Sequence, residues 1–172
     1  MKIAMIGAVG LSLASGIALA QTTSNSATAA GAPDMFVTQS AIGNQFEIDE
    51  SRLAVKRSTS PEIKKFAERM ITDHGKAGKE LKRIVKKDKL GTVPSKLDAD
   101  HQASLEALRK TKGADFDKAY VADQLKAHDG AVKLFSDYAQ SGSQPELKDF
   151  ASKTLPTIQD HQKHAQMLST GQ

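Results

Sequence analysis

Three histidines, His74, His128 and His161, stand on apolar helical stripes where an aliphatic side chain is the usual occupant, and a fourth residue able to bind a metal, Glu47, borders such a stripe. The stretch 68–78, ERMITDHGKAG, shows this most clearly, because Met70 and Ile71 belong to a stripe whose next member is His74. Imidazole nitrogens and carboxylate oxygens are ligands of transition metals. The residue types therefore raise the hypothesis of a site for a single transition-metal ion, Zn, Cu, Mn or Fe.

Counting along the chain places these four residues at one level of a helical bundle. In an antiparallel helical hairpin, residues equally far from the connection lie opposite each other. Glu47 lies 14 residues before the proline that opens the second helix and His74 lies 13 after it, while His128 and His161 lie 17 before and 16 after the proline that opens the last helix. At 1.5 Å per residue, each pair is roughly 20 to 25 Å from its loop. Two hairpins that dock without a large stagger would then bring all four side chains into one layer.

The same layer has an interpretation without metal. Buried polar groups need hydrogen-bond partners, and a closed network would supply them. In that network Glu47 would bond to His74, and His128 would bond to His161. Both interpretations, a metal site and a core hydrogen-bond network, follow from the sequence.

Di-iron chemistry is disfavoured. Ferritin-like di-iron proteins carry Glu-x-x-His on two helices. Here Ile71 and Ile158 stand three residues before His74 and His161, and a third helix presents His128 where the pattern has a carboxylate. The bridging carboxylates are therefore missing.

Other polar residues near the layer are weaker candidates. Asp73, Asp129 and Asp160 each adjoin a stripe histidine by one position, so they point about 100° away around the helix. We expect them at the helix surface or behind the histidines rather than as ligands. His164 lies one turn after a stripe histidine, and His101 has no evident partner.

The elements that must position the layer are helices almost throughout. Apolar periodicity and start and stop signals predict helices over 35–57, 61–88, 97–110, 115–140 and 145–168. Asp34 and Ser60 are the expected N-caps of the first two, and Pro156 should kink the last. The fold class is all-α: a four-helix bundle with a short extra helix in the crossover between the second and third long helices.

The N-terminal segments differ from this domain. Residues 1–20 have an early lysine, an uncharged run and small residues at Ala18 and Ala20, which predicts a secretory signal peptide cleaved before Gln21. An uncleaved anchor is the alternative. Residues 21–33 are small and polar and predict a disordered leader, followed by the bundle domain over 34–170. The mature protein is expected to be periplasmic or secreted, or peripheral to the outer membrane.

The composition of the chain limits how the protein can be stabilised and what kinds of partner it can bind. The chain has 172 residues and no cysteine, so packing or a metal must replace disulfides. Lys and Arg total 24 against 20 acids, and removing Lys2 leaves 23 against 20, a net charge of +3. No nucleic-acid motif accompanies this charge, so we expect no nucleic-acid partner. The positive charge is consistent with weak contact with anionic surfaces of the cell envelope. No segment after residue 20 is expected to span a membrane. The sequence indicates no protein partner.

Several short stretches carry a resemblance to a known family. They are Phe36-Val37 with Glu47, Phe66-Ala67 through Met70 to Asp73-His74, Phe116 to Tyr120, His128, and Thr154-Leu155-Pro156 with His161. In these the chain resembles the domain of unknown function 4142 family, exported bacterial proteins of ferritin-like fold. The resemblance implies a four-helix bundle outside the cytoplasm and implies no assigned activity.

The function expected from the sequence is that of a non-enzymatic envelope protein that binds one metal ion in its Glu/His layer. A metal-dependent redox enzyme on the same layer is one alternative. A pH-responsive binding module, in which protonated histidines loosen the bundle, is another. No catalytic residue is assigned, because no nucleophile elbow, phosphate loop or dinucleotide fingerprint occurs.

Overall fold

The computed structural model describes residues 32–171, which form five α-helices and no strand. The helices are α1 (Pro33–Arg57), α2 (Pro61–Lys87), α3 (Ala99–Lys110), α4 (Gly113–Ser141) and α5 (Pro145–Thr170). The expected all-α bundle with a short extra helix is thereby confirmed. The predicted signal peptide and residues 21–31 of the predicted leader lie outside the described residues. Within 32–171, no helix is both long and apolar enough to cross a membrane.

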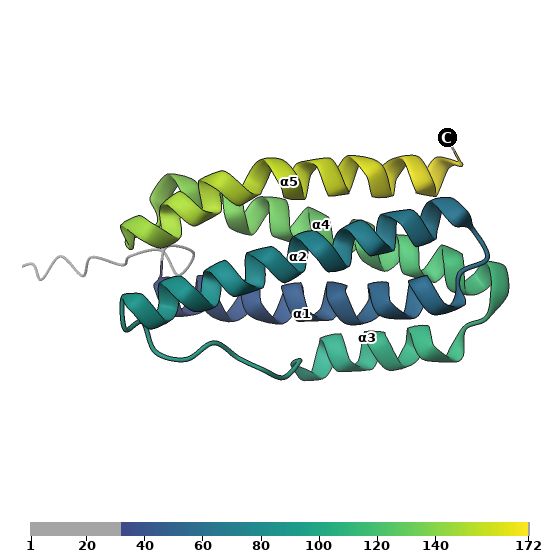
Figure 1. The fold of residues 1–172 in the computed structure, drawn as a ribbon, viewed down its shortest axis with the longest axis horizontal. Helices are drawn as coiled ribbons and strands as arrows, with labels where there is room; N and C mark the ends of the chain where they lie inside the picture. Colours follow the sequence, from purple (N-terminus) through teal and green to yellow (C-terminus); the bar gives the residue numbers. More distant parts are fainter. Residues whose placement is uncertain (1–31, 172) are drawn as a thin grey trace, which may run out of the picture.

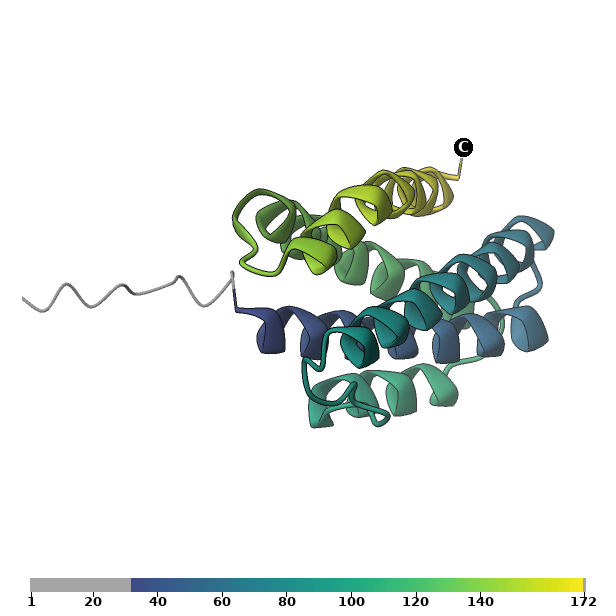
Figure 2. The ribbon, with the colours of Figure 1, turned by 60° about the vertical axis from the view of Figure 1, so that its left-hand side comes forward.

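Two helical hairpins make up the bundle. The helices α1 and α2 pack against each other, as do α4 and α5, and the two pairs meet through α1 with α4 and α2 with α5. Figure 2 shows the α4–α5 pair lying over the α1–α2 pair. The short helix α3 lies along α1 on the outside of the bundle (Figure 1).

The helix starts refine the predicted bounds. The first helix begins at Pro33 after Ala32, with no side-chain cap, so the expected Asp34 cap was wrong and the helix starts two residues before the predicted position 35. The proline explains this, because its fixed φ is already helical and it needs no N–H partner in the first turn. The short helix begins two residues later than predicted, because Asp98 is its N-cap and accepts a hydrogen bond from the backbone N–H of His101. The last helix continues on both sides of Pro156.

A polar layer divides the core into two apolar clusters. One cluster lies at the end of the bundle that holds the α4–α5 turn and is built around Phe36, Leu81, Phe135, Tyr138 and Phe150. The other lies at the opposite end and is built around Phe66, Met70, Leu108, Phe116 and Tyr120. Buried polar residues separate the contributions of each long helix to the two clusters, and they include Glu47, His74, His128 and His161, one from each helix. The apolar clusters thus fix the level at which these four side chains meet.

Candidate metal centre

Three imidazole rings from three helices meet at the centre of the bundle. The ring centroids of His74 and His128 are 5.8 Å apart, those of His74 and His161 5.4 Å, and those of His128 and His161 5.5 Å. One nitrogen of each ring lies within 4.8 Å of the corresponding nitrogens of the other two. The residues are 7%, 0% and 1% exposed, respectively. Side-chain rotation over a short distance would let three such nitrogens share one ion.

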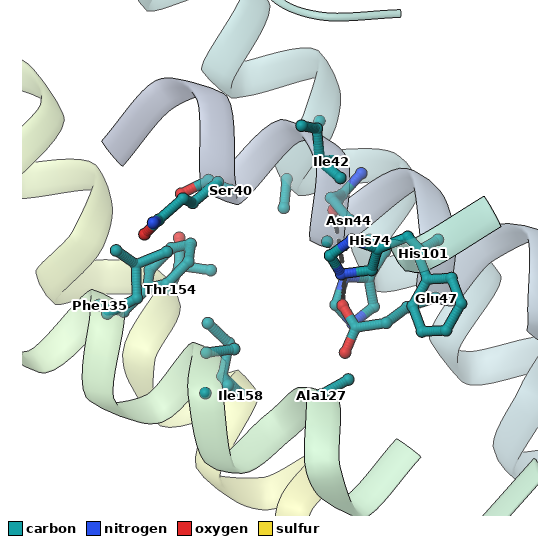
Figure 3. A pocket seen from close by; sticks show the side chains of 18 of the residues that line it. Ser40, Ile42, Asn44, Glu47, His74, His101, Ala127, Phe135, Thr154 and Ile158 are labelled. Atoms are coloured by element: carbon teal, nitrogen blue, oxygen red, sulfur yellow. Dashed lines mark hydrogen bonds and ion pairs between the residues drawn. The ribbon is translucent and has the colours of Figure 1, made fainter. Parts of the chain in front are cut away.

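The N–H of His74 is held by two side chains of α1. Its Nδ1 lies 3.1 Å from Oδ1 of Asn44 and 3.3 Å from Oε2 of Glu47, so Nδ1 carries the proton and donates. Gly78 makes room for this contact, because a Cβ built there would lie 2.9 Å from Nδ2 of Asn44. Figure 3 shows Asn44, Glu47 and His74 close together. Nε2 of His74 keeps its lone pair.

The other two histidines are oriented in the same way. Nδ1 of His128 donates to the backbone carbonyl of Gln124 at 2.8 Å and lies 3.2 Å from Oε1 of Glu47. Nε2 of His161 donates to Oδ2 of Asp73 at 3.1 Å. Each ring therefore has one nitrogen fixed as a donor, which leaves the other as an acceptor.

The three acceptor nitrogens have no partner within the described chain. Nε2 of His74, Nε2 of His128 and Nδ1 of His161 are buried without a hydrogen bond. Orphaned buried acceptors are uncommon in folded proteins, and each one calls for an explanation. A transition metal fits this donor set, because metal-bound histidines usually donate their second N–H to a carboxylate or a carbonyl. The residues present thus suit a metal ion.

The predicted layer is assembled with different internal contacts from those expected. All four residues come together, and the expected contact between Glu47 and His74 is present. No hydrogen bond joins His128 to His161 among the described residues, because each ring's donor nitrogen faces an oxygen on its own or a neighbouring helix. Asp73 lies behind His161, as its position in the helix had suggested.

Two contributors to the centre were not identified from the sequence, Asn44 and the backbone carbonyl of Gln124, and neither was the neighbouring buried acid Glu50. The carboxyl of Glu50 is fully buried and accepts a hydrogen bond at 3.0 Å from the side chain of Gln124. Its spacing of three residues from Glu47 on α1 was the available signal, because it places both acids on one face.

Of the remaining candidates, His101 pairs with Asp98 at 2.7 Å and packs against the ring of Phe46, and His164 packs against Phe66. Neither belongs to the central cluster. Of the five histidines, three therefore face the centre of the bundle.

Burial keeps the centre neutral in the absence of metal. It lowers the pKa of His74 well below its usual value and that of His128 to about 4. The pKa of His161 is also lowered, chiefly by burial. Burial raises the pKa of Glu47 to about 8 and, together with the charge of Asp123, that of Glu50 to about 9. At neutral pH the rings are thus uncharged, the form that binds metals.

The metal-free protein is expected to be most stable near pH 6.5. Below that pH, the histidines of the unfolded chain bind protons, whereas the buried histidines of the folded chain stay neutral. The free energy of unfolding therefore decreases as the pH falls from 6.5 toward the pKa of about 4 that His128 has in the folded state. Above it, stability is lost as the pH rises toward 8 and 9, because the folded state holds protons on Glu47 and Glu50 that the unfolded state has released. Urea unfolding at several pH values, with a chelator present, measures this. A midpoint that rises steadily from pH 6 to 9 would contradict it.

Comparison with known proteins identifies a matching family and several structures of similar fold. The model of the family described as "Domain of unknown function (DUF4142)" matches residues 18–168. No curated protein matches the chain. Among solved structures, CopM in its Cu(II)-bound form is similar with a TM-score of 0.68 at 21% identity, over 79% of this chain and 94% of that one. CopM co-crystallised with Ag gives 0.66 at 22% identity, over 80% and 94%.

A second protein of known structure is similar in fold. A DUF305 fragment from Deinococcus radiodurans gives a TM-score of 0.72 at 12% identity, over 83% of this chain and 99% of the fragment. At these identities the structural matches support the helical-bundle fold. The family model, in contrast, spans both hairpins and all four residues of the polar layer. The chain therefore belongs to the DUF4142 family.

Proposed function

We propose that this protein binds one transition-metal ion through the three histidines of its polar layer. The ligands are Nε2 of His74, Nε2 of His128 and Nδ1 of His161. Glu47 lies on the opposite side of two of these rings and orients them. The observation that carries the proposal is that all three acceptor nitrogens are buried and unpartnered while the other nitrogen of each ring is held by an oxygen.

Copper is the first candidate for the metal, and zinc the second. Imidazole nitrogens favour Cu(II) over the other divalent first-row ions. The fold neighbour CopM was solved with Cu(I), Cu(II) and Ag, which supports the same class of metal. Carboxylate-rich sites suit Mn and Fe better than this set of three neutral rings does.

The proposed role is that of a metal-holding protein outside the cytoplasm. The predicted signal peptide over 1–20 supports export. Intact mass of the protein recovered from the periplasm tests this, with Gln21 as the expected first residue.

Metal content tests the function directly. Protein produced without an affinity tag is incubated with Cu, Zn, Mn or Fe, desalted and measured by elemental analysis. We expect close to one equivalent of copper in the wild type and almost none in the double variant His74→Ala, His161→Ala. Circular dichroism confirms that each protein is helical.

A matched variant tests whether metal loss depends on which histidines are removed rather than on how many. The double variant His101→Ala, His164→Ala also removes two histidines, but from outside the central cluster, and it should keep its metal. Equal metal loss in both double variants would contradict the proposal, as would wild-type protein that takes up no metal.

Glu47 is expected to strengthen metal binding without being a ligand. In Glu47→Gln, one oxygen that faces a ring N–H becomes an amide NH₂, which cannot accept that hydrogen bond. Loss of such a carboxylate behind metal-bound histidines typically weakens affinity about 10- to 100-fold. Competition with a chelator of known affinity measures the change.

Glu50→Gln is the matched control for this variant. Glu50 lies three residues along the same helix, is equally buried and contacts Gln124 rather than a histidine. Metal affinity should therefore be unchanged in Glu50→Gln. Similar losses in both variants would show that Glu47 has no special role.

A further inference from the structure

Four exposed lysines follow one another along the last part of α2. Lys79, Lys82 and Lys86 lie in the helix, and Lys89 lies in the turn after it. Steps of three and four residues are close to full turns of an α-helix, so the three helical lysines lie within an arc of roughly 60°. These four residues form the lysine stripe, a row of like charge on the outside of the bundle.

The lysine stripe has no counter-charge of its own. Within residues 32–171, none of its four side chains has a hydrogen bond or an ion pair. The helix dipole attracts cations only to the last turn of a helix. It accounts for Lys86 and Lys89, but Lys79 and Lys82 lie one to two turns earlier. The dipole alone therefore does not explain the stripe.

The acidic residues of the same segment face α5. Glu80 pairs with Arg83 at 2.8 Å, and its charge also acts on Lys153 of α5. Asp88 accepts a hydrogen bond at 3.1 Å from Gln144, the residue before α5. One side of α2 is thus balanced in charge against α5, whereas the side with the lysine stripe keeps an excess of positive charge.

The lysine stripe lies at the end of the bundle where the chain enters it. The helix α1 begins at Pro33 and packs antiparallel to α2, so its start lies at the same end as the last turns of α2 (Figure 1). The signal peptide predicted over 1–20 is a kind of segment that enters a membrane during export. A bundle still joined to that segment meets the bilayer with this end nearest.

The chemistry of the stripe favours a lipid surface over a nucleic acid. Lysine ammonium groups act as point charges, and clusters of about four to eight basic residues on a helix are typical of binding to anionic lipids. Proteins that bind single-stranded nucleic acids add aromatic rings on which bases stack. The large apolar side chains exposed on the described chain are two methionines, Met35 and Met167, so no such ring accompanies the lysines.

We propose that the lysine stripe docks this protein on the surface of a bilayer that contains anionic phospholipids, with α2 lying along that surface. The contact is electrostatic and does not depend on the metal, because the stripe is exposed whereas the three histidines are buried in the core. The inference goes beyond the proposed function, since it gives a metal-holding protein a place at the membrane.

Sedimentation with vesicles tests the proposal. Protein recovered from the periplasm without an affinity tag is mixed with vesicles of phosphatidylcholine, either alone or with phosphatidylglycerol. Binding should require phosphatidylglycerol and should fall steeply as salt is raised, because salt screens exposed charges beyond about 8 Å at physiological ionic strength. Equal binding to both kinds of vesicle would overturn the proposal, as would binding that salt does not weaken.

A variant without the charges of the stripe locates the surface. Each lysine near an anionic leaflet strengthens binding about fivefold. Neutralising all four should therefore weaken binding to the phosphatidylglycerol vesicles at least about fiftyfold. The variant carries Lys79→Gln, Lys82→Gln, Lys86→Gln and Lys89→Gln.

A matched control removes the same net charge from elsewhere. It replaces by glutamine one exposed lysine from each long helix: Lys56, Lys65, Lys118 and Lys163. Because it keeps the lysine stripe, its vesicle binding should fall less than about fivefold. Circular dichroism confirms that both variants are helical. Equal losses in the two variants would overturn the proposal, since net charge alone would then explain the binding.

Two further measurements complete the test. Duplex DNA in the same buffer should bind more weakly than the phosphatidylglycerol vesicles, and tighter binding to DNA would overturn the choice of a lipid surface. Copper-loaded and metal-free protein should bind the vesicles alike. Failure to bind vesicles would leave metal binding intact, and failure to bind metal would leave the docking surface intact, so the two proposals can fail separately.

Discussion

Copper or zinc is expected to raise the free energy of unfolding by about 4 kcal/mol when free metal exceeds the Kd a thousandfold. The three proposed ligands come from α2, α4 and α5, and 33 to 87 residues of chain separate them. Only the folded bundle brings them together, so the metal binds the native state in preference to the unfolded one. Urea unfolding followed by circular dichroism, with and without metal, measures the gain.

His128→Ala should abolish most of this stabilisation. His128 is fully buried and one of its nitrogens is unpartnered, so its removal takes one ligand of three from the centre. The wild-type gain should also disappear when a chelator is added, which shows that the effect is reversible. A metal-induced gain of equal size in His128→Ala would contradict the assignment of the site, since metal bound elsewhere would then explain the stabilisation.

Phe36→Ala is expected to destabilise the bundle by roughly 3 to 5 kcal/mol, the usual cost of deleting a buried aromatic ring. Phe36 is fully buried on α1 and stacks on Tyr138, with ring centroids 4.0 Å apart. It also packs edge-to-face with Phe135 and Phe150, with ring centroids 5.1 Å and 6.4 Å away. One ring of the first hairpin thus packs against three rings of the second, and alanine would leave a cavity where the hairpins meet.

Met35→Ala is the control for this prediction. Met35 precedes Phe36 in the same helix and is 38% exposed, so its loss should change stability by about 0.5 kcal/mol or less. Thermal unfolding of metal-free protein compares the two variants, and we expect the midpoint of Phe36→Ala to fall by roughly 10 °C. Similar midpoints for both variants would show that the aromatic cluster does not join the hairpins as described.

The sequence by itself determined the helices and the level of the polar layer. Apolar spacing of 3.6 residues identifies the inward face of each helix, which is why His74, His128 and His161 were recognised as interior residues. Counting from the two short connections then placed them at one height, because antiparallel helices rise equally on both sides of a turn. The helix bounds differed where local chemistry was decisive, as at Pro33 and Asp98.

Only the tertiary structure decided which atoms face which. Periodicity gives the face and height of a residue but leaves its rotamer open, together with the ring nitrogen that carries the proton. Those depend on oxygens supplied by other segments: Glu47 and Asn44 on α1 for His74, and Asp73 on α2 for His161. The docking of the two hairpins brings these groups together, and it also leaves a cavity beside the rings. Long-range packing therefore determined the three free nitrogens on which the proposed metal centre depends.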